Sequence, residues 1–210
     1  MRGHATCRSP LALRGARASG SSHGPVLRLL FSRSVERVTD RLLLRRWRLG
    51  DAARFASINA DPDVMRYIGH GHVLGRALSD ELIARFEREW DERGFGLWAV
   101  APREEPERLL GFCGLSVPMF LPSVLPAVEV GWRLGRDAWG HGYATEGARE
   151  ALRFAFAEHG MAEVISIIDP RNDRSLRVAE KLGMTERPGR VHPATRRRVR
   201  VLGIAPGELQ

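Results

Sequence analysis

A short glycine-bearing loop at residues 139–146, Trp-Gly-His-Gly-Tyr-Ala-Thr-Glu, constrains the fold more than any other stretch. The apolar run before it, residues 127–134, predicts a strand, and residues 147–159 after it predict a helix. Glycines let the backbone turn tightly and approach a ligand. A helix that begins there adds unpaired N–H groups and the positive end of its dipole. The loop therefore predicts an anion site for phosphate or pyrophosphate, although the spacing alone also fits a plain turn into a helix.

Two common nucleotide-binding patterns are not met by this chain. The dinucleotide pattern G-x-G-x-x-G requires a glycine where Thr145 stands, and no G-x-x-x-x-G-K-[ST] occurs in a chain whose single lysine is Lys181. We therefore expect neither a dinucleotide on a Rossmann unit nor a nucleoside triphosphate.

Strand and helix patterns alternate along the rest of the chain. Apolar runs predict further strands at residues 97–101, 109–115 and 164–168, and a last pair at 185–190 and 196–204. Asp51 is the expected cap of a helix over residues 51–59, and Ser79 or Asp80 that of a helix over 81–92. In the helix after the loop, a stripe of small apolar residues is expected to face the sheet: Ala148, Ala151, Leu152 and Ala155.

The strand, the loop and the helix together resemble motif A of the GCN5-related N-acetyltransferases, the GNAT superfamily. They are most similar to the RimJ/RimL branch, which includes ribosomal-protein N-terminal acetyltransferases. Trp139 departs from the Gln or Arg that is general in the superfamily, but tryptophan is usual in this branch. The sequence after Pro170, with Asn172, Ser175 and Glu-Lys-Leu-Gly-Met at 180–184, resembles motif B of the same branch.

The resemblance covers about residues 39–205 and implies an α/β (α+β) fold of GNAT type. In that fold a mixed, mostly antiparallel sheet carries helices on both faces. It also implies acetyl-CoA as co-substrate, no metal, and a loop that holds the pyrophosphate of acetyl-CoA. The implied CoA-binding residues are Val130, Trp132, Leu134, Trp139, Gly140, His141, Gly142, Tyr143, Ala144, Thr145, Asn172 and Ser175. Asn172 is also a good helix cap, and the two roles do not exclude each other.

Glu129 is the candidate general base for acetyl transfer to an amine. It is the only ionisable residue in the apolar run 127–131, and many family members carry a catalytic glutamate at this strand position. Two structural alternatives remain open: a carboxylate on the solvent face, or a partner of Arg133. The backbone N–H of Val130 or of a neighbour is the expected donor to the thioester carbonyl, where the strand splays open.

The general acid is harder to assign. The family often has a tyrosine two residues before the Lys-Leu-Gly triplet, and this chain has Ala179 there. Ser175 is the candidate catalytic residue, with Tyr143 or no residue at all as alternatives, because a free thiolate leaves unaided (its pKa is about 8.5).

No motif identifies the acceptor, which is expected to be a protein N-terminus or a small-molecule amine. Tyr67 and Trp98 are the candidate acceptor-binding residues. His70 and His72 lie in the same glycine-rich loop as Tyr67, and these loop residues are equally compatible with a plain surface loop.

The net charge of +8 is concentrated at one end of the chain. Residues 1–38 contain seven arginines and a single acidic residue, Glu36. This composition predicts a disordered extension over 1–38 and an acetyltransferase domain over 39–206, although it also fits a transit peptide or a misassigned start. Because the excess charge lies in the extension, nucleic acid is not an expected partner of the domain.

The remaining expectations concern compartment and assembly. The apolar run at residues 26–31 is too short to span a membrane. Two cysteines, Cys7 and Cys113, cannot build a framework of several disulfides and form no zinc pattern, so a cytoplasmic location is expected. The sequence does not fix the oligomeric state, for which a monomer or a homodimer is the expectation. Two other function classes fit the same sequence: a CoA-binding sensor or scaffold without turnover, and a ribosome- or RNA-associated protein that uses the basic extension.

Overall fold

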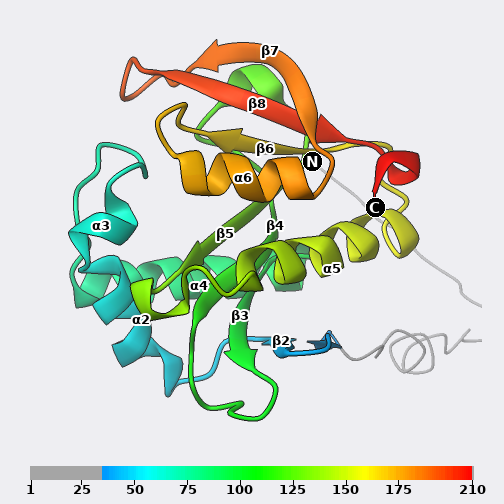
Figure 1. Cartoon of the computed structure of the whole chain (residues 1–210). Coiled ribbons are helices and arrows are strands. Elements are labelled where there is room, and N and C mark those ends of the chain that lie inside the picture. Colours follow the sequence, from blue (N-terminus) through cyan, green and yellow to red (C-terminus); the bar gives the residue numbers. More distant parts are fainter. Residues whose placement is uncertain (1–34, 210) are drawn as a thin grey trace, which may run out of the picture. The chain divides into compact units, whose positions relative to one another are not determined.

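The structure, a computed structural model, describes residues 35–209. In this part of the chain one sheet of eight strands runs in the order β1-β2-β3-β4-β5-β6-β8-β7 (Figure 1). Neighbouring strands are antiparallel except β5 and β6, which are parallel. The strands are β1 (Arg37–Val38), β2 (Leu42–Arg45), β3 (Leu97–Pro102), β4 (Gly111–Ser116), β5 (Glu129–Leu134), β6 (Val164–Ile168), β7 (Thr185–Val191) and β8 (Arg198–Ile204).

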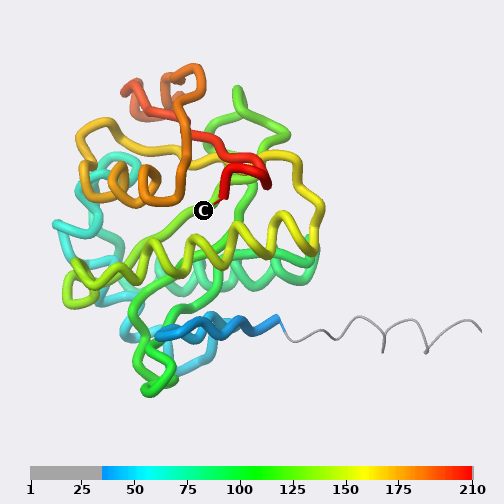
Figure 2. Tube along the Cα trace, turned by 45° about the vertical axis from the view of Figure 1, so that its right-hand side comes forward, coloured from blue at the N-terminus to red at the C-terminus, as the bar shows by residue number. Residues whose placement is uncertain are grey.

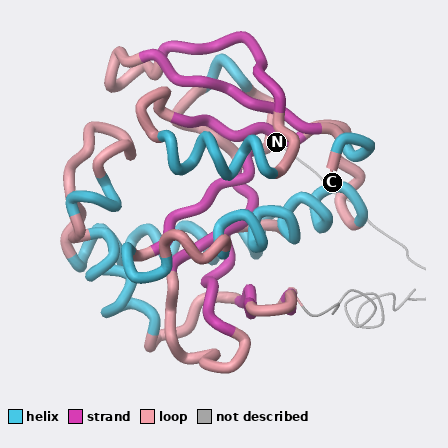
Figure 3. The backbone as a smooth tube through the Cα atoms, viewed as in Figure 1, coloured by secondary structure: helices cyan, strands magenta, loops and turns pink. Residues whose placement is uncertain are grey.

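Helices cover both faces of this sheet. Figure 1 shows α5 crossing in front of β3, β4 and β5, with α4 behind them, and α6 lies between β6 and α5 in Figures 1 and 2. Figure 3 shows the same layers by type of element. The predicted fold class, a mixed and mostly antiparallel sheet with helices on both faces, is confirmed. The helices are α2 (Asp51–Asn59), α3 (Pro62–Met65), α4 (Arg76–Arg93), α5 (Tyr143–Ala157) and α6 (Asp173–Lys181).

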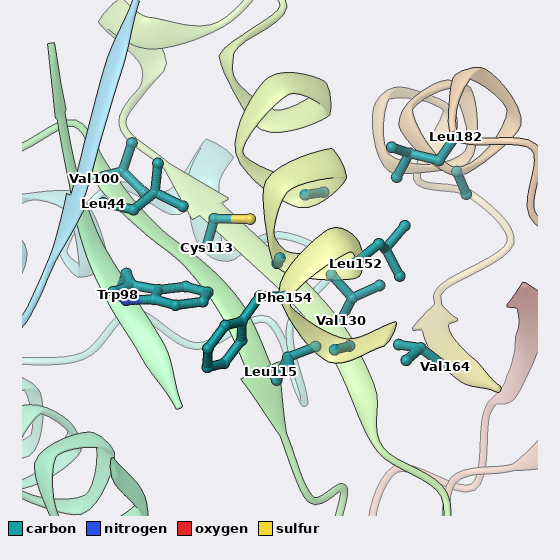
Figure 4. Packing of buried hydrophobic residues seen from close by; sticks show 14 of the residues in the cluster. Leu44, Trp98, Val100, Cys113, Leu115, Val130, Leu152, Phe154, Val164 and Leu182 are labelled. Atoms are coloured by element: carbon teal, nitrogen blue, oxygen red, sulfur yellow. The ribbon is translucent and has the colours of Figure 1, made fainter. Parts of the chain in front are cut away.

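The predicted small-residue stripe holds α5 against the sheet. Ala148, Ala151, Leu152 and Ala155 are all fully buried. Because these side chains are mostly small, the helix axis lies close to the strands, and a Cβ added at Gly147 would stand 3.3 Å from a side-chain atom of the sheet. Figure 4 shows α5 side chains packed against residues of β3, β4 and β5.

An aromatic cluster fixes the helices of the opposite face. The rings of Trp47, Phe55, Phe86 and Phe112 come from β2's end, α2, α4 and β4, with centroids 4.8 to 6.2 Å apart. Such tilted and edge-on pairs add to the burial of large apolar surfaces. The cluster therefore positions α2 and α4 relative to β4.

Two predicted helix caps are wrong. Helix α2 is capped by Gly50, and Asp51 is instead buried against the Arg45 guanidinium, with N···O distances of 2.7 and 2.8 Å. Helix α4 begins at Arg76 after Gly75, and Ser79 is buried inside it, where its hydroxyl accepts a hydrogen bond from Asn59. Asp80, the alternative cap, also lies inside α4 and accepts from Arg76 at 2.8 Å. For Asp51 and Ser79 a tertiary partner occupies the polar side chain that would otherwise cap a helix.

The described fold begins before the boundary predicted at Thr39, since β1 at Arg37–Val38 pairs with β2. Residues 1–34 of the predicted extension, and Cys7 with them, lie outside the described residues. Cys113 is a free, buried cysteine of β4. No helix in the described range is long and apolar enough to cross a membrane.

Gly111 in β4 offers a test of this packing. Its φ is +145°, and a Cβ placed there would stand 2.1 Å from the Arg133 carbonyl oxygen. We expect Gly111→Ala to lower the free energy of unfolding by about 2 kcal/mol or more, measured by urea denaturation. Gly50→Ala is the matched control, because no atom lies within 4 Å of an added Cβ there, and its change should stay within about 0.5 kcal/mol. Equal stability of the two variants would contradict the close approach of β4 to β5.

Candidate functional site

A cavity of about 610 Å³ lies between the second half of β5, the start of α5 and the first turns of α6. The segment around the end of α3, at residues 63–68, lines its remaining side. Figure 1 shows β5 and β6 diverging toward this region.

The cavity exists because β5 and β6 pair over a single register position, Glu129 opposite Ile165. The Ile165 N–H donates to the Val128 carbonyl at 2.9 Å. In a continuing parallel ladder the next N–H of β6, that of Ile167, would donate to the Val130 carbonyl. It donates instead to the Glu129 carboxylate, with an N···Oε1 distance of 3.2 Å. The side chain of Glu129 therefore takes the place of a backbone acceptor where the strands separate.

Glu129 is consequently a buried carboxyl group. It is 9% exposed, and burial raises its pKa from 4.5 to about 8, with the hydrogen bond from Ile167 offsetting part of the rise. In the described part of the chain no ion pair joins Glu129 to Arg133, whose guanidinium donates to Asn59 at 2.7 Å. Neither structural alternative, a solvent-facing carboxylate or an Arg133 partner, describes this residue.

Backbone polar groups of β5 face the gap beyond Glu129. The Gly135 N–H donates to the carbonyl of Leu110, the residue before β4, so Arg133 and Gly131 direct their backbone groups toward β4 by strand alternation. Trp132 and Leu134 then direct theirs toward the gap, whereas the Val130 N–H, the donor expected for the thioester carbonyl, pairs with the Ile165 carbonyl at the single ladder position. The Leu134 carbonyl accepts from the indole of Trp139 at 2.9 Å, which agrees with this direction. The N–H and C=O of Trp132 are therefore available to an extended ligand with amide groups.

The glycine loop has the geometry of an anion site. Gly140 and Gly142 have φ of +81° and +80°, a left-handed conformation that favours glycine. Gly142 is the residue before α5 and supplies no side-chain cap, so the first N–H groups of this 15-residue helix remain for a ligand. Arg174, Arg177 and Lys181 of α6 line the same cavity and add positive charge.

Glu146 fixes this loop to the edge of the sheet. Its carboxylate accepts hydrogen bonds from Thr39 Oγ1 at 2.6 Å and Arg41 Nε at 2.7 Å. Arg41 also donates to the His141 carbonyl at 2.9 Å. Burial alone would raise the pKa of Glu146, but the hydrogen bonds from Thr39 and Arg41 outweigh it, and the pKa lies below 4.5. The carboxylate therefore stays charged and holds the loop in place.

Helix α6 is tied to β5 across the cavity. Asn172 caps the helix by accepting from the Ser175 N–H at 3.2 Å, as predicted. The Ser175 hydroxyl accepts from the Trp132 indole at 3.3 Å. These two hydrogen bonds hold the start of α6 opposite the open edge of β5.

The structure gathers most of the predicted site residues in one place. All of the predicted CoA-binding residues line the cavity except Val130, which is buried in the core, and His141, which is exposed. Tyr67 lines it too. Trp98 does not: it is fully buried, and its indole donates to the Val35 carbonyl at 2.8 Å. Its place is in the core of β3, away from any acceptor.

Several cavity residues were not identified from the sequence. Arg174 stacks over the Trp139 ring at 4.2 Å from the centroid, and its position inside motif B is the signal that could have found it. Arg133, Arg66 and Arg171 also line the cavity. Arg171 also lies inside motif B, and Arg133 shares a strand face with Glu129.

Comparisons with known proteins agree with this arrangement. The family described as acetyltransferase (GNAT) domain matches residues 41–185. An uncharacterized Bacillus subtilis protein, YkkB, is 38% identical over 156 residues, which cover 70% of this chain and 83% of that protein. The Aspergillus fumigatus FsC-acetyl coenzyme A-N(2)-transacetylase is 32% identical over 141 residues, 61% of this chain and 55% of that protein. An acetyltransferase structure from Agrobacterium tumefaciens has the same fold, with a TM-score of 0.69 at 24% identity over 80% of this chain and 93% of that one.

The raised pKa of Glu129 predicts a pH-dependent stability. Between pH 4.5 and about 8 the folded protein keeps this proton while the unfolded chain has lost it, so the free energy of unfolding falls as pH rises through this window. Glu129→Gln, whose amide carbonyl can still accept from Ile167, removes that contribution. We expect its stability relative to wild type to improve by roughly 1–3 kcal/mol from pH 5 to pH 8 in urea denaturation. Glu104→Gln, at an exposed position, is the control, and parallel profiles for wild type and Glu129→Gln would contradict the buried carboxyl.

Proposed function

Because the chain belongs to the GNAT acetyltransferase family, we propose that it transfers the acetyl group of acetyl-CoA to a primary amine, on a small molecule or a protein N-terminus. The observation that carries this proposal is the buried Glu129 carboxyl at the point where β5 and β6 separate. A group with a pKa of about 8 suits the removal of a proton from an amine of similar pKa, about 8 for an α-amino group.

The cavity fits acetyl-CoA at three of its parts. The left-handed glycines and the start of α5 suit the pyrophosphate, and Arg174, Arg177 and Lys181 supply further positive charge. The backbone C=O of Trp132 suits an amide N–H of the pantetheine arm, which would replace the missing strand partner. The thioester would then lie at the separation of β5 from β6.

The chemistry follows from groups at this separation. Glu129 accepts the proton of the attacking amine, whose nitrogen forms a bond to the thioester carbonyl carbon. The backbone N–H of Trp132 is the proposed donor to the developing oxyanion, since the Val130 N–H pairs with the Ile165 carbonyl. The C–S bond then breaks, and the proton reaches the leaving thiolate from Ser175 or from solvent, since a thiolate of pKa about 8.5 is a tolerable leaving group.

A narrower assignment rests on the motifs. The sequence at residues 139–146 and at 170–184 resembles the RimJ/RimL branch, and we propose that the chain belongs there. The acceptor class that this branch includes, ribosomal-protein N-termini, would then be one member of the amine panel.

The test of the base is the release of free CoA at saturating acetyl-CoA, against a panel of amines, for wild type and Glu129→Gln. We expect kcat/KM of the wild type to rise with pH up to about 8, as Glu129 loses its proton. In the variant, kcat/KM should no longer show this rise with pH. Its kcat should fall at least about tenfold, which corresponds to about 1.4 kcal/mol of activation free energy. Unchanged turnover in the variant would remove Glu129 from the chemistry and leave the enzyme, whereas CoA binding without turnover on any amine would favour a sensor.

The glycine loop is tested by a pair of variants at two glycines that both have a left-handed backbone conformation. Gly142→Ala places a Cβ at φ +80° in the anion site, and Gly160→Ala places one at φ +61° beyond α5, where no atom lies within 4 Å. We expect the first to raise KM for acetyl-CoA by about tenfold with little change in kcat, because it distorts groups that bind the phosphates. The second should leave both constants unchanged. The same KM in both variants would argue against phosphate binding by this loop.

A further inference from the structure

The side of the cavity away from the glycine loop is rich in arginine. Arg66, Arg133 and Arg171 line the main cavity. A second cavity of about 440 Å³ shares Arg66 and Arg171 with it and adds Arg197. The ring of Tyr67 lies between two of these groups, with the Arg66 and Arg171 guanidinium carbons 5.6 and 5.8 Å from its centroid.

Acidic residues neutralise this wall only in part, although Asp173 also lines the main cavity. Asp63 lines both cavities but is engaged in an ion pair with Arg136. Asp169 pairs with Arg171 at 2.7 Å. In residues 35–209 no carboxylate forms an ion pair with Arg66, Arg133 or Arg197.

Arg133 is the most constrained of these groups. Its Nη1 donates to Asn59 at 2.7 Å, its guanidinium carbon lies 5.1 Å from the centroid of the Phe112 ring, and its Nε is buried without a hydrogen-bond partner. Burial lowers its pKa to about 10, with the charge of Arg85 adding to the effect. A desolvated guanidinium that faces neutral partners is unfavourable, and an incoming anion would relieve that cost.

The neutral partner of Arg133 is itself fixed. Asn59 is fully buried, and its amide nitrogen donates to Ser79 Oγ at 3.0 Å. The Asn59 oxygen therefore holds the guanidinium in one orientation at the cavity wall. The Arg133 guanidinium is therefore preorganised to bind an anion, because the protein itself supplies no charged partner for it.

Strand geometry aligns Arg133 with the proposed base. Glu129, Gly131 and Arg133 alternate onto one face of β5, with the first and last Cα about 13 Å apart. Gly131 stands between them, and an added Cβ there would meet no atom within 4 Å. The missing side chain leaves open space between the carboxyl and the guanidinium, which suits a small molecule with an amine at one end and an anion at the other.

We propose that the acceptor is an amine that also carries an anionic group, a carboxylate or a phosphate, bound by Arg133 with Arg66 on the same cavity wall. This inference rests on the proposed acetyl transfer, whose acceptor it narrows. Guanidinium groups match both anions by paired hydrogen bonds, and the same charges disfavour a polycationic amine.

The test compares matched acceptors at saturating acetyl-CoA. The carboxylate arm is 4-aminobutyrate against 4-aminobutanamide, the phosphate arm is 3-aminopropylphosphonate against propylamine, and spermidine is the polycation. We expect the wild type to favour the anionic member of at least one pair by about tenfold or more in kcat/KM. The pair that shows this preference identifies the anion as a carboxylate or a phosphate. In Arg133→Gln this preference should fall to near unity, mainly through KM. Arg103→Gln, an exposed position outside both cavities, loses the same charge and should keep the preference.

Binding separates this inference from the reaction itself. Calorimetric titration of 4-aminobutyrate and 3-aminopropylphosphonate into the CoA-bound protein needs no turnover. Binding that depends on Arg133 without CoA release on any amine would support the anion site and refute acetyl transfer. Turnover of neutral amines or spermidine at equal or higher efficiency would overturn the anion site and leave acetyl transfer intact. If Arg133→Gln does not fold, Arg66→Gln, at an exposed position of the cavity wall, replaces it. The same ratio of kcat/KM for the anionic and the neutral acceptor is then measured.

Discussion

The hydrogen bond from the Ile167 N–H to the Glu129 carboxylate is the interaction on which the site depends. A sheet cannot open in its interior without leaving backbone groups unpaired, and buried unpaired groups are costly. Glu129 satisfies the first of them with its side chain, and the strands separate beyond it. The same step buries the carboxyl group and raises its pKa to about 8. The same hydrogen bond therefore accompanies both the separation of the strands and the raised pKa of the proposed base.

The walls of the opening are held by contacts from several directions. The alanine stripe sets α5 close to the sheet, and Glu146 joins the glycine loop to Thr39 and Arg41 at the sheet's edge. On the other side, the Trp132–Ser175 hydrogen bond and the Asn172 cap hold α6. Because each wall rests on regular elements, a bound ligand would meet groups that are already positioned.

Two arginines, Arg45 and the half-buried Arg133, show how differently the fold treats the same side chain. Arg45 is 1% exposed and meets Asp51 through two hydrogen bonds, so its charge is satisfied inside the protein. Arg133 meets the neutral amide of Asn59 and leaves its Nε unpaired. The first arrangement joins β2 to α2, and Arg45 lines neither of the two cavities described above, whereas Arg133 lines the main one. This contrast is the physical basis for assigning a structural role to Arg45 and a binding role to Arg133.

The strand, loop and helix around residues 139–146 and the cap at Asn172 were predictable from local backbone preferences, such as glycine at positive φ and an asparagine before a helix. Most of the cavity lining was predicted instead from the resemblance of two motifs to GNAT sequences. The remaining features depend on contacts between distant segments. Asp51 and Ser79 do not cap helices as predicted, because they form hydrogen bonds with Arg45 and Asn59 instead. Trp98, a predicted acceptor-binding residue, lies in the core. That Glu129 meets a backbone N–H, while Arg133 meets no carboxylate, depends on which residues from distant segments arrive beside them, and no local pattern encodes that.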